Sequence, residues 1–244
     1  MDNVMRVFAI LLIAAAGAAF CFFKVRISRK RRRAMEEAAD RLGLRFSPGR
    51  NRELPRRFRF LDRLRRGEDR YAFNTFSGEW KGHRVVAGDF HYRVFSPGRG
   101  GTRHHYLSFF VLLLSHRLPE LIIGREKLFS RIADDFRGVG VSFESHEFSR
   151  KFRVRSRDRK FAYDVCHPRM IEYLLENDDL SIEIETGALA LTFNRRLDPV
   201  RIEANLDRLV EVRELLPGYL FSRTPGTGVD RETDGRVHWN PLEL

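Results

Sequence analysis

The 244-residue chain is poor in cysteine and lacks the short signatures that identify common enzyme classes. Its two cysteines are Cys21 and Cys166, so no disulfide framework holds the fold. The motifs G-x-S-x-G, H-E-x-x-H, paired C-x-x-C and the P-loop are absent. This excludes the hydrolases, zinc proteases and nucleotide-binding proteins that depend on those signatures.

Charged residues are also missing from the stretch between Val7 and Phe23. As a helix with about 1.5 Å of rise per residue, this stretch spans roughly 25 Å, near the lower limit for crossing a bilayer. Val4 and Met5 extend it, because the Arg6 side chain can reach the headgroup region. We therefore predict a transmembrane helix over residues 4–23.

A basic juxtamembrane run, residues 24–33, follows without a single acidic residue. Its positive members are Lys24, Arg26, Arg29, Lys30, Arg31, Arg32 and Arg33. The net charge is +12 and Asp2 cancels Arg6, so the chain after this run carries 12 − 7 = +5. Basic flanks stay inside and attract anionic headgroups. The run thus predicts membrane-surface contact and a single-pass inner-membrane protein with its C-terminal domain in the cytoplasm.

A cleaved signal peptide is the alternative interpretation of this segment. The small residues at 14–19 favour cleavage. However, Phe20–Phe23 continues the apolar stretch beyond any cleavage point, and the basic run resists translocation. Both features favour a retained anchor.

Beyond the basic run, strand and helix patterns alternate over residues 34–222. Strands are predicted at 70–78, 83–95, 104–115, 120–126, 141–145 and 151–156, with a hairpin at 180–195. Helices are predicted at 34–43, 127–138, 158–178 and 198–216, and the third is expected to break or restart at Pro168. Since hairpins outnumber crossovers, we predict one cytoplasmic α+β domain, a mainly antiparallel sheet with helices on one face. A break into two sub-domains near 138–140 remains open.

Several local signals fix the details of this prediction. Turns are expected at Glu79–Gly82 and at Thr186–Gly187, and the run from Tyr106 to Leu114 reads as a central strand buried on both faces. Asp198 caps the last helix, whose buried face is Ile202, Leu206, Leu209, Val210 and Leu216. After Ser222 the periodicity ends, which predicts a flexible tail over 223–244.

Candidate chemistry is sparse, and we expect no cofactor. Asp89, His91 and His104 are candidate metal ligands, because two imidazoles and a carboxylate on adjacent strands suit a divalent ion. The simpler interpretation is that these are polar residues on an exposed sheet face. Under this interpretation we expect no metal site and no catalytic residue. For Glu183 and Glu185, which share a strand face, solvent exposure likewise explains the alternation better than acid–base catalysis.

Two further polar clusters have simple explanations. Around His146 and Ser149, adjacency in sequence does not supply the hydrogen-bond geometry and oriented acid that a Ser–His nucleophile pair needs. We expect instead that Ser145 or Ser149 caps a turn, with Phe148 and Phe152 in the core. An arginine cluster at 56–66 would give a nucleic-acid binder its phosphate contacts. We expect instead a solvated connection close to the membrane.

Four stretches resemble a loosely defined group of bacterial proteins. These are RLGLRFSP, NTFSGEWKGHRVVAGDFHYRV, LPELIIGRE and FESHEFSRKFRVRSRD. Members of the group have a single N-terminal span and a cytoplasmic α+β domain, with no assigned activity. The resemblance implies the same placement for residues 4 to about 216 and carries no site residues.

Together these observations predict a non-enzymatic binding or scaffolding domain tethered at the cytoplasmic face, with a protein partner. An enzyme with a site near Asp89, His91 and His104 is one alternative. A nucleic-acid binder that uses the 56–66 cluster is the other, and we consider nucleic acid an improbable partner because most of the excess charge belongs to the basic run.

Overall fold

The computed structural model describes residues 17, 22–23, 26, 28–96, 101–125 and 139–222. Most of the predicted span at 4–23, Lys24 of the basic run, the predicted helix at 127–138 and the predicted tail at 223–244 lie outside these residues. Within the described residues, no helix has both the length and the hydrophobicity to cross a bilayer.

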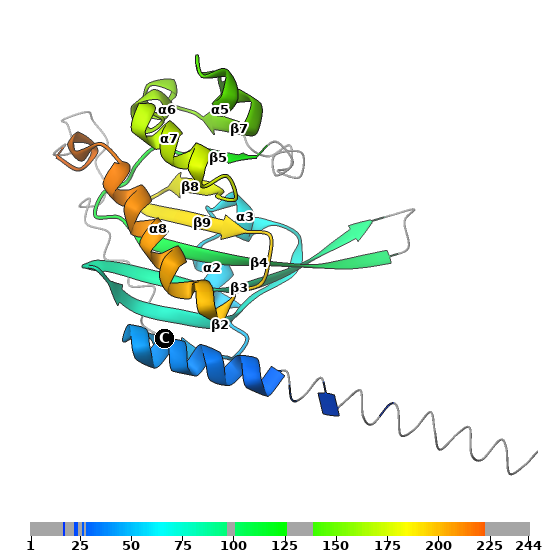
Figure 1. Ribbon diagram of the computed structural model, residues 1–244. Helices are drawn as coiled ribbons and strands as arrows, with labels where there is room; N and C mark the ends of the chain where they lie inside the picture. The colour runs from blue at the N-terminus through cyan, green and yellow to red at the C-terminus, as the bar shows by residue number, and fades with distance from the viewer. Residues whose placement is uncertain are drawn as a thin grey trace, which may run out of the picture.

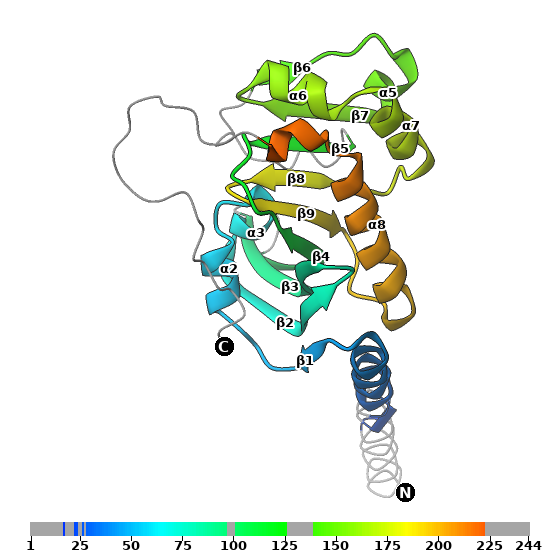
Figure 2. The same cartoon turned by 90° about the vertical axis from the view of Figure 1, so that its left-hand side faces the viewer.

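One antiparallel sheet organises the described part of the chain, and it contains nine strands there. Figure 2 shows the strands stacked in the order β1-β2-β3-β4-β9-β8-β5-β7-β6. Their bounds are β1 Arg45–Ser47, β2 Glu68–Trp80, β3 His83–Ser96, β4 Gly101–Leu113, β5 Leu121–Arg125, β6 Val139–Val141, β7 Phe152–Ser156, β8 Ile182–Glu185 and β9 Ala188–Phe193. A mainly antiparallel α+β fold is therefore confirmed.

The helices are short except for the first and the last. A helix over residues 28–42, called here the N-terminal helix, precedes β1. The others are α2 Glu53–Arg57, α3 Asp62–Arg65, α5 His146–Lys151, α6 Arg159–Val165, α7 Pro168–Glu176 and α8 Ile202–Leu215, with 3-10 turns η1 Pro199–Arg201 and η2 Gly218–Phe221. Ser145, Asp158 and Asp198 each accept a backbone N–H at a helix start, as N-caps do.

Helices cover both faces of the sheet, and the expectation of one covered face was wrong. The larger core lies under α8 and includes Met35 of the N-terminal helix, Phe110 of β4 and the predicted face of α8. A second core on the opposite face joins α2 and α3 to Phe90 and Phe109. Figure 2 shows α2 and α3 on one side of the sheet and α8 on the other. The short apolar segment 54–64 supplies this second cover.

Turn and burial predictions agree with the structure at several places. Lys81 and Gly82 turn β2 into β3 with positive φ values of 48° and 80°, and Thr186 and Gly187 turn β8 into β9 with 49° and 80°. This backbone matches the twist of the flanking strands. Residues 107–112 of β4 are buried, as expected for a central strand, but Tyr106 at the start of the predicted run is exposed. Pro168 starts α7.

Strands from both sides of residues 138–140 belong to the same sheet. β4 pairs with β9, for example at Phe110 with Leu191, and β5 pairs with both β7 and β8. The core under α8 extends from Met35 to Leu216. A sub-domain break at 138–140 stays a prediction, and the continuous sheet gives it no support.

Candidate functional site

A buried carboxylate in β3 ties three distant parts of the chain together. Asp89 is fully buried. Its Oδ2 accepts hydrogen bonds from Arg31 Nη2 at 2.9 Å and Asn74 Nδ2 at 2.8 Å, and its Oδ1 accepts from the Leu197 backbone N–H at 2.6 Å. Arg196 Nε lies 4.0 Å from Oδ2. Two cations and two neutral donors thus satisfy the buried charge.

Arg31 belongs to the basic run that was predicted to contact lipid headgroups. The structure gives it partners inside the domain, because it also donates to the Leu197 carbonyl at 2.7 Å. The other described members of the run, Arg26, Arg29, Lys30, Arg32 and Arg33, are exposed. Headgroup contact stays a prediction for those five, whereas Arg31 holds the N-terminal helix to the sheet.

The predicted metal ligands come together only in part. His91 Nε2 lies 2.9 Å from His104 Nδ1, so the two imidazoles meet diagonally across a register in which His91 pairs with Tyr106. Asp89 shares their sheet face, but its oxygens are bonded to other groups. Among the described residues, no three metal-ligating side chains are grouped to hold an ion. The enzyme alternative therefore lacks its three-residue convergence in the described part of the chain.

Hydrogen bonding fixes the tautomer of His91. Its Nδ1 lies 3.3 Å from the Asp69 carbonyl, which can only accept, so Nδ1 carries the proton. Burial lowers the pKa of His91, which keeps the ring neutral. Nε2 is then the acceptor for the Nδ1–H of His104. The pair is thus a directed chain of hydrogen bonds that runs from His104 through His91 to the Asp69 carbonyl.

Aromatic rings surround this pair and carry arginines on their outer side. His91 stacks on Tyr71 with ring centroids 4.5 Å apart, and Tyr106 lies 5.0 Å away. The guanidinium of Arg196 lies 5.4 Å from the centre of the Tyr106 ring, and that of Arg50 lies 4.6 Å from the centre of the Tyr71 ring. These contacts are within cation–π range. Tyr71 and His91 are buried, whereas Tyr106, Arg50 and Arg196 are exposed, so one aromatic ring and two positive charges of this cluster reach the surface.

Glu183 and Glu185 of β8 were expected to face solvent, and this expectation was wrong. Glu183 is buried beneath α3, and its two oxygens accept the backbone N–H groups of Asp62 and of Arg63, the latter at 3.3 Å. Burial raises the pKa of Glu183 to about 8 and that of Glu185 to about 7. Glu183 thereby caps the first turn of α3, which is a structural role.

The arginine cluster at 56–66 is partly internal. Arg63 is only 3% exposed and donates to Asn194, and burial lowers its pKa to about 10. Arg65 and Arg66 pair with Asp62 at 3.2 and 3.0 Å. Arg63, Arg65 and Arg66 are thus engaged within the fold, which weakens the nucleic-acid alternative.

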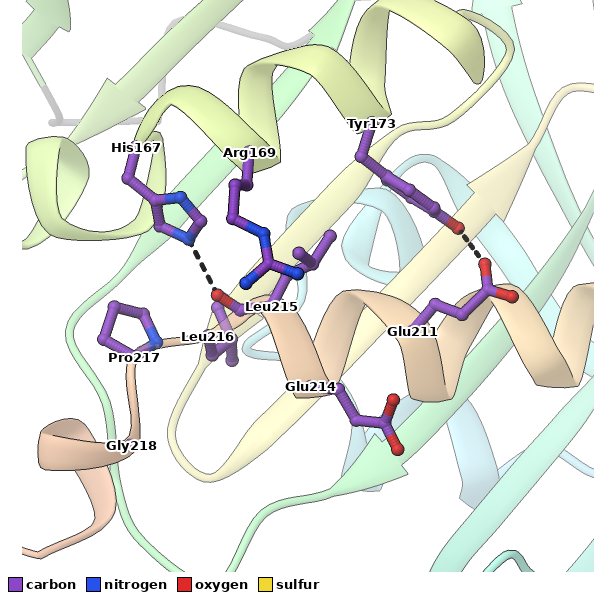
Figure 3. Close-up of a pocket in the computed structure, with 9 residues that line it drawn as sticks. All are labelled: His167, Arg169, Tyr173, Glu211, Glu214, Leu215, Leu216, Pro217 and Gly218. Atoms are coloured by element: carbon purple, nitrogen blue, oxygen red, sulfur yellow. Dashed lines mark hydrogen bonds between the residues drawn. The ribbon is translucent and has the colours of Figure 1, made fainter.

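The described surface has an open groove of about 610 Å³ between α7 and the end of α8 (Figure 3). Its lining is His167, Arg169, Tyr173, Glu211, Glu214, Leu215, Leu216, Pro217 and Gly218. η2 closes one end and is held against α8 by Arg213, whose guanidinium lies 3.6 Å from the centre of the Phe221 ring. Sequence reasoning missed the groove because its two halves lie about 40 residues apart and form no motif.

Two polar contacts fix the walls of the groove. Tyr173 donates its O–H to Glu211 Oε2 at 2.7 Å, and burial raises the pKa of that phenol. His167 Nε2 donates to the Leu215 carbonyl at 2.9 Å. Arg169 and Glu214 are exposed on the rims. The groove thus has an apolar floor and opposite charges on its edges.

Comparison with known proteins identifies a fold and no family. No protein-family model matches the sequence, and no curated protein matches it. Among solved structures, the fold resembles the crystal structure of the mycobacterial trehalose monomycolate transport factor A, TtfA, with a TM-score of 0.57 and 13% sequence identity. The match covers 76% of this chain and 95% of that chain. At this identity, the likeness concerns the fold alone.

Proposed function

We propose that this chain is a non-enzymatic accessory protein of a membrane transport process. A single N-terminal span tethers it to the inner membrane, and its α+β domain binds a protein partner at the cytoplasmic face. The apolar stretch at 4–23 and the basic run supply the sequence basis for the tether.

The observation that carries this proposal is the attachment of the N-terminal helix to the domain. Met35, Ala38 and Ala39 of that helix are at most 2% exposed and belong to the core under α8. Arg31, one turn earlier, is bonded to buried Asp89. A helix joined to its domain by both packing and an ion pair holds that domain in one orientation, as an adaptor at a membrane needs.

The fold likeness supports an accessory role. The similar structure is named a transport factor for trehalose monomycolate. The described surface of this chain offers a groove and the exposed ring of Tyr106. The buried carboxylates of Asp89 and Glu183 are hydrogen-bonded to backbone N–H groups of the domain itself. We extend the transport-factor role to this chain as a proposal and leave the transported substance open.

We place the contact with the partner in the groove between α7 and α8. Its floor of Leu215, Leu216 and Pro217 accepts apolar side chains, while Arg169 and Glu214 on the rims suit a segment with charges of both signs. Such a segment lies across the groove and buries its apolar residues at the centre, as in other peptide sites.

Site-specific photo-crosslinking in membranes of cells that produce the full chain tests this proposal. A photoreactive residue replaces Glu214 on the groove rim, and the matched control replaces Glu53, another exposed glutamate, on the opposite face of the sheet. We expect a discrete protein adduct from position 214 and none from position 53. No adduct at 214, or the same adducts at both positions, would overturn the assignment of the groove.

A further inference from the structure

The outer end of the β3–β4 hairpin extends beyond its neighbours in the sheet. β2 pairs with β3 only as far as Glu68 with Arg93, and β9 pairs with β4 only from Ser108 onward. Residues 94–96 and 101–103, here called the β3–β4 ribbon, pair only with each other. Figure 1 shows this ribbon projecting from the sheet. A two-stranded ribbon is marginally stable alone in water, so its projection calls for a partner.

Large apolar side chains on the ribbon and at its base face solvent. Phe95 is 67% exposed, Val94 is 39% exposed and Tyr106 is 42% exposed. Val94 and Phe95 are adjacent in the strand and point to opposite faces, so the ribbon exposes apolar groups on both of its sides. Apolar groups on both sides of a narrow projection suit insertion into a soft, surrounding medium better than docking on a flat protein surface.

The charge of this hairpin end is of one sign. The described residues 90–96 and 101–108 contain no Asp or Glu, and they include Arg93 and Arg103. Asp69 lies 3.5 Å from Arg93 and offsets it in part, whereas Arg103 is exposed. Arginine with Phe and Tyr is the composition found where proteins meet headgroups, and anionic lipids attract such cations.

The position of the ribbon agrees with a membrane surface. Asp89, six residues before Phe95 on the same strand, is bonded to Arg31 near the start of the N-terminal helix. In Figure 1 the ribbon and the residue-28 end of this helix project to the same side of the sheet. That end of the helix follows the predicted span. A bilayer that holds the span therefore lies on the side toward which the ribbon points.

From this geometry we infer that the β3–β4 ribbon is a lipid-binding element that seats Phe95 and its neighbours in the headgroup region of an anionic bilayer. The inference rests in part on the proposed tether. It adds a second membrane contact, which sets the tilt of the domain and hence the direction in which the groove faces.

Spin-label accessibility in reconstituted full-length chain tests the inference. Cys21 and Cys166 are replaced by Ala, and a single label is placed by Phe95→Cys or, as the control, by Glu79→Cys. Glu79 lies in β2 and pairs with Arg84 at the other end of β3. Both sites are on the surface, so the core is not altered by the labels. Collision of the label with oxygen and with a water-soluble nickel chelate is measured in vesicles with and without phosphatidylglycerol.

We expect position 95 to lose chelate accessibility and to gain oxygen accessibility in vesicles with phosphatidylglycerol, while position 79 stays accessible to the chelate in both. A label at 95 that is as accessible to the chelate as the label at 79 would overturn the inference. Protection at 95 only in native membranes would also overturn it, in favour of a protein partner. Alkaline carbonate washing of the same vesicles tests the tether separately, because a chain that remains bound retains its span whatever the ribbon does.

Discussion

Arg31 and Asp89 are separated by 58 residues in the sequence and joined by an ion pair of 2.9 Å. The carboxylate is fully buried, whereas the guanidinium side chain is 26% exposed. The pair therefore links the end of the basic run to the middle of the sheet. It makes the N-terminal helix part of the folded domain, so that the orientation of one follows the orientation of the other.

Disrupting this pair is expected to destabilise the domain. Asp89→Asn leaves Arg31 without its counterion and places an amide donor against the donors of Arg31 and Asn74. We expect a loss of about 3 kcal/mol in the free energy of unfolding, as for one partner removed from a buried pair. Urea unfolding of Asp89→Asn, Arg31→Gln and the double variant should give a coupling energy of about 1–2 kcal/mol.

The neighbouring exposed pair provides the control for that cycle. Arg32 Nε bonds Glu36 at 3.0 Å on the same helix, and both side chains are about half exposed. The corresponding cycle of Arg32→Gln and Glu36→Gln should give no more than about 0.5 kcal/mol. Equal coupling energies in the two cycles would show that burial of Asp89 contributes nothing.

Glu183 should make the fold less stable as pH rises. Its folded pKa of about 8 lies above the ordinary 4.5, because burial disfavours the charged form. Between these two values the unfolded chain releases the proton while the folded chain keeps it, so the free energy of unfolding falls with pH. Glu183→Gln keeps an acceptor for the Asp62 N–H and removes this titration.

The measurement is urea unfolding at intervals from pH 5 to pH 8. Relative to wild type, Glu183→Gln should gain stability steadily over this range. Glu185→Gln should do so in the lower part of the range, since the pKa of Glu185 is about 7. A difference between wild type and Glu183→Gln that does not change with pH would mean that Glu183 is ionised throughout.

Two glycines with similar backbone angles should respond differently to a methyl group. Gly43 and Gly67 have φ values of +65° and +62°. A Cβ on Gly43 meets nothing within 4 Å, whereas one on Gly67 lies 2.3 Å from the Arg93 carbonyl oxygen at the base of the β3–β4 ribbon. We expect Gly43→Ala to cost about 1 kcal/mol. Gly67→Ala should cost about 3 kcal/mol, because a steric clash adds to the strain. Thermal or urea unfolding of both variants measures the two losses in the free energy of unfolding. Equal losses would argue against the close approach of Gly67 to the Arg93 carbonyl.

The thiol of Cys166 should be chemically inert in the folded chain. It is buried, and burial raises its pKa to about 12, so almost no thiolate forms at pH 8. In a Cys21→Ala variant, a disulfide reagent should label far less than one thiol per chain until denaturant is added. Rapid labelling under native conditions would show that α6 opens readily.

Local patterns in the sequence were sufficient for elements whose structure depends on near neighbours. The repeat of apolar residues on α8 predicted Ile202, Leu206 and Leu209 as buried, and all three are. Turn residues located both predicted hairpins, since Gly82 and Gly187 supply the positive φ that tight turns require. Ser145, one of the two serines expected to cap a turn, is the N-cap of α5.

Features that depend on distant segments could not be predicted in this way. The alternation that placed Glu183 opposite Ile182 and Ile184 was correct, but the cover over that face comes from α3, about 120 residues earlier. The pairing of β4 with β9 and the bond from Arg31 to Asp89 likewise have no local signal. Side chains on the same face of adjacent strands can be paired from sequence, as His91 and His104 were. The segment that covers such a face cannot be predicted in this way.

Alkaline carbonate extraction tests the membrane tether most directly, with membranes from cells that produce the full chain with a tag after Leu244. We predict that the chain stays in the membrane pellet and that the tag resists protease added outside intact spheroplasts. Recovery of the chain in the carbonate supernatant would contradict the tether. Digestion of the tag in intact spheroplasts would contradict the cytoplasmic placement of the domain.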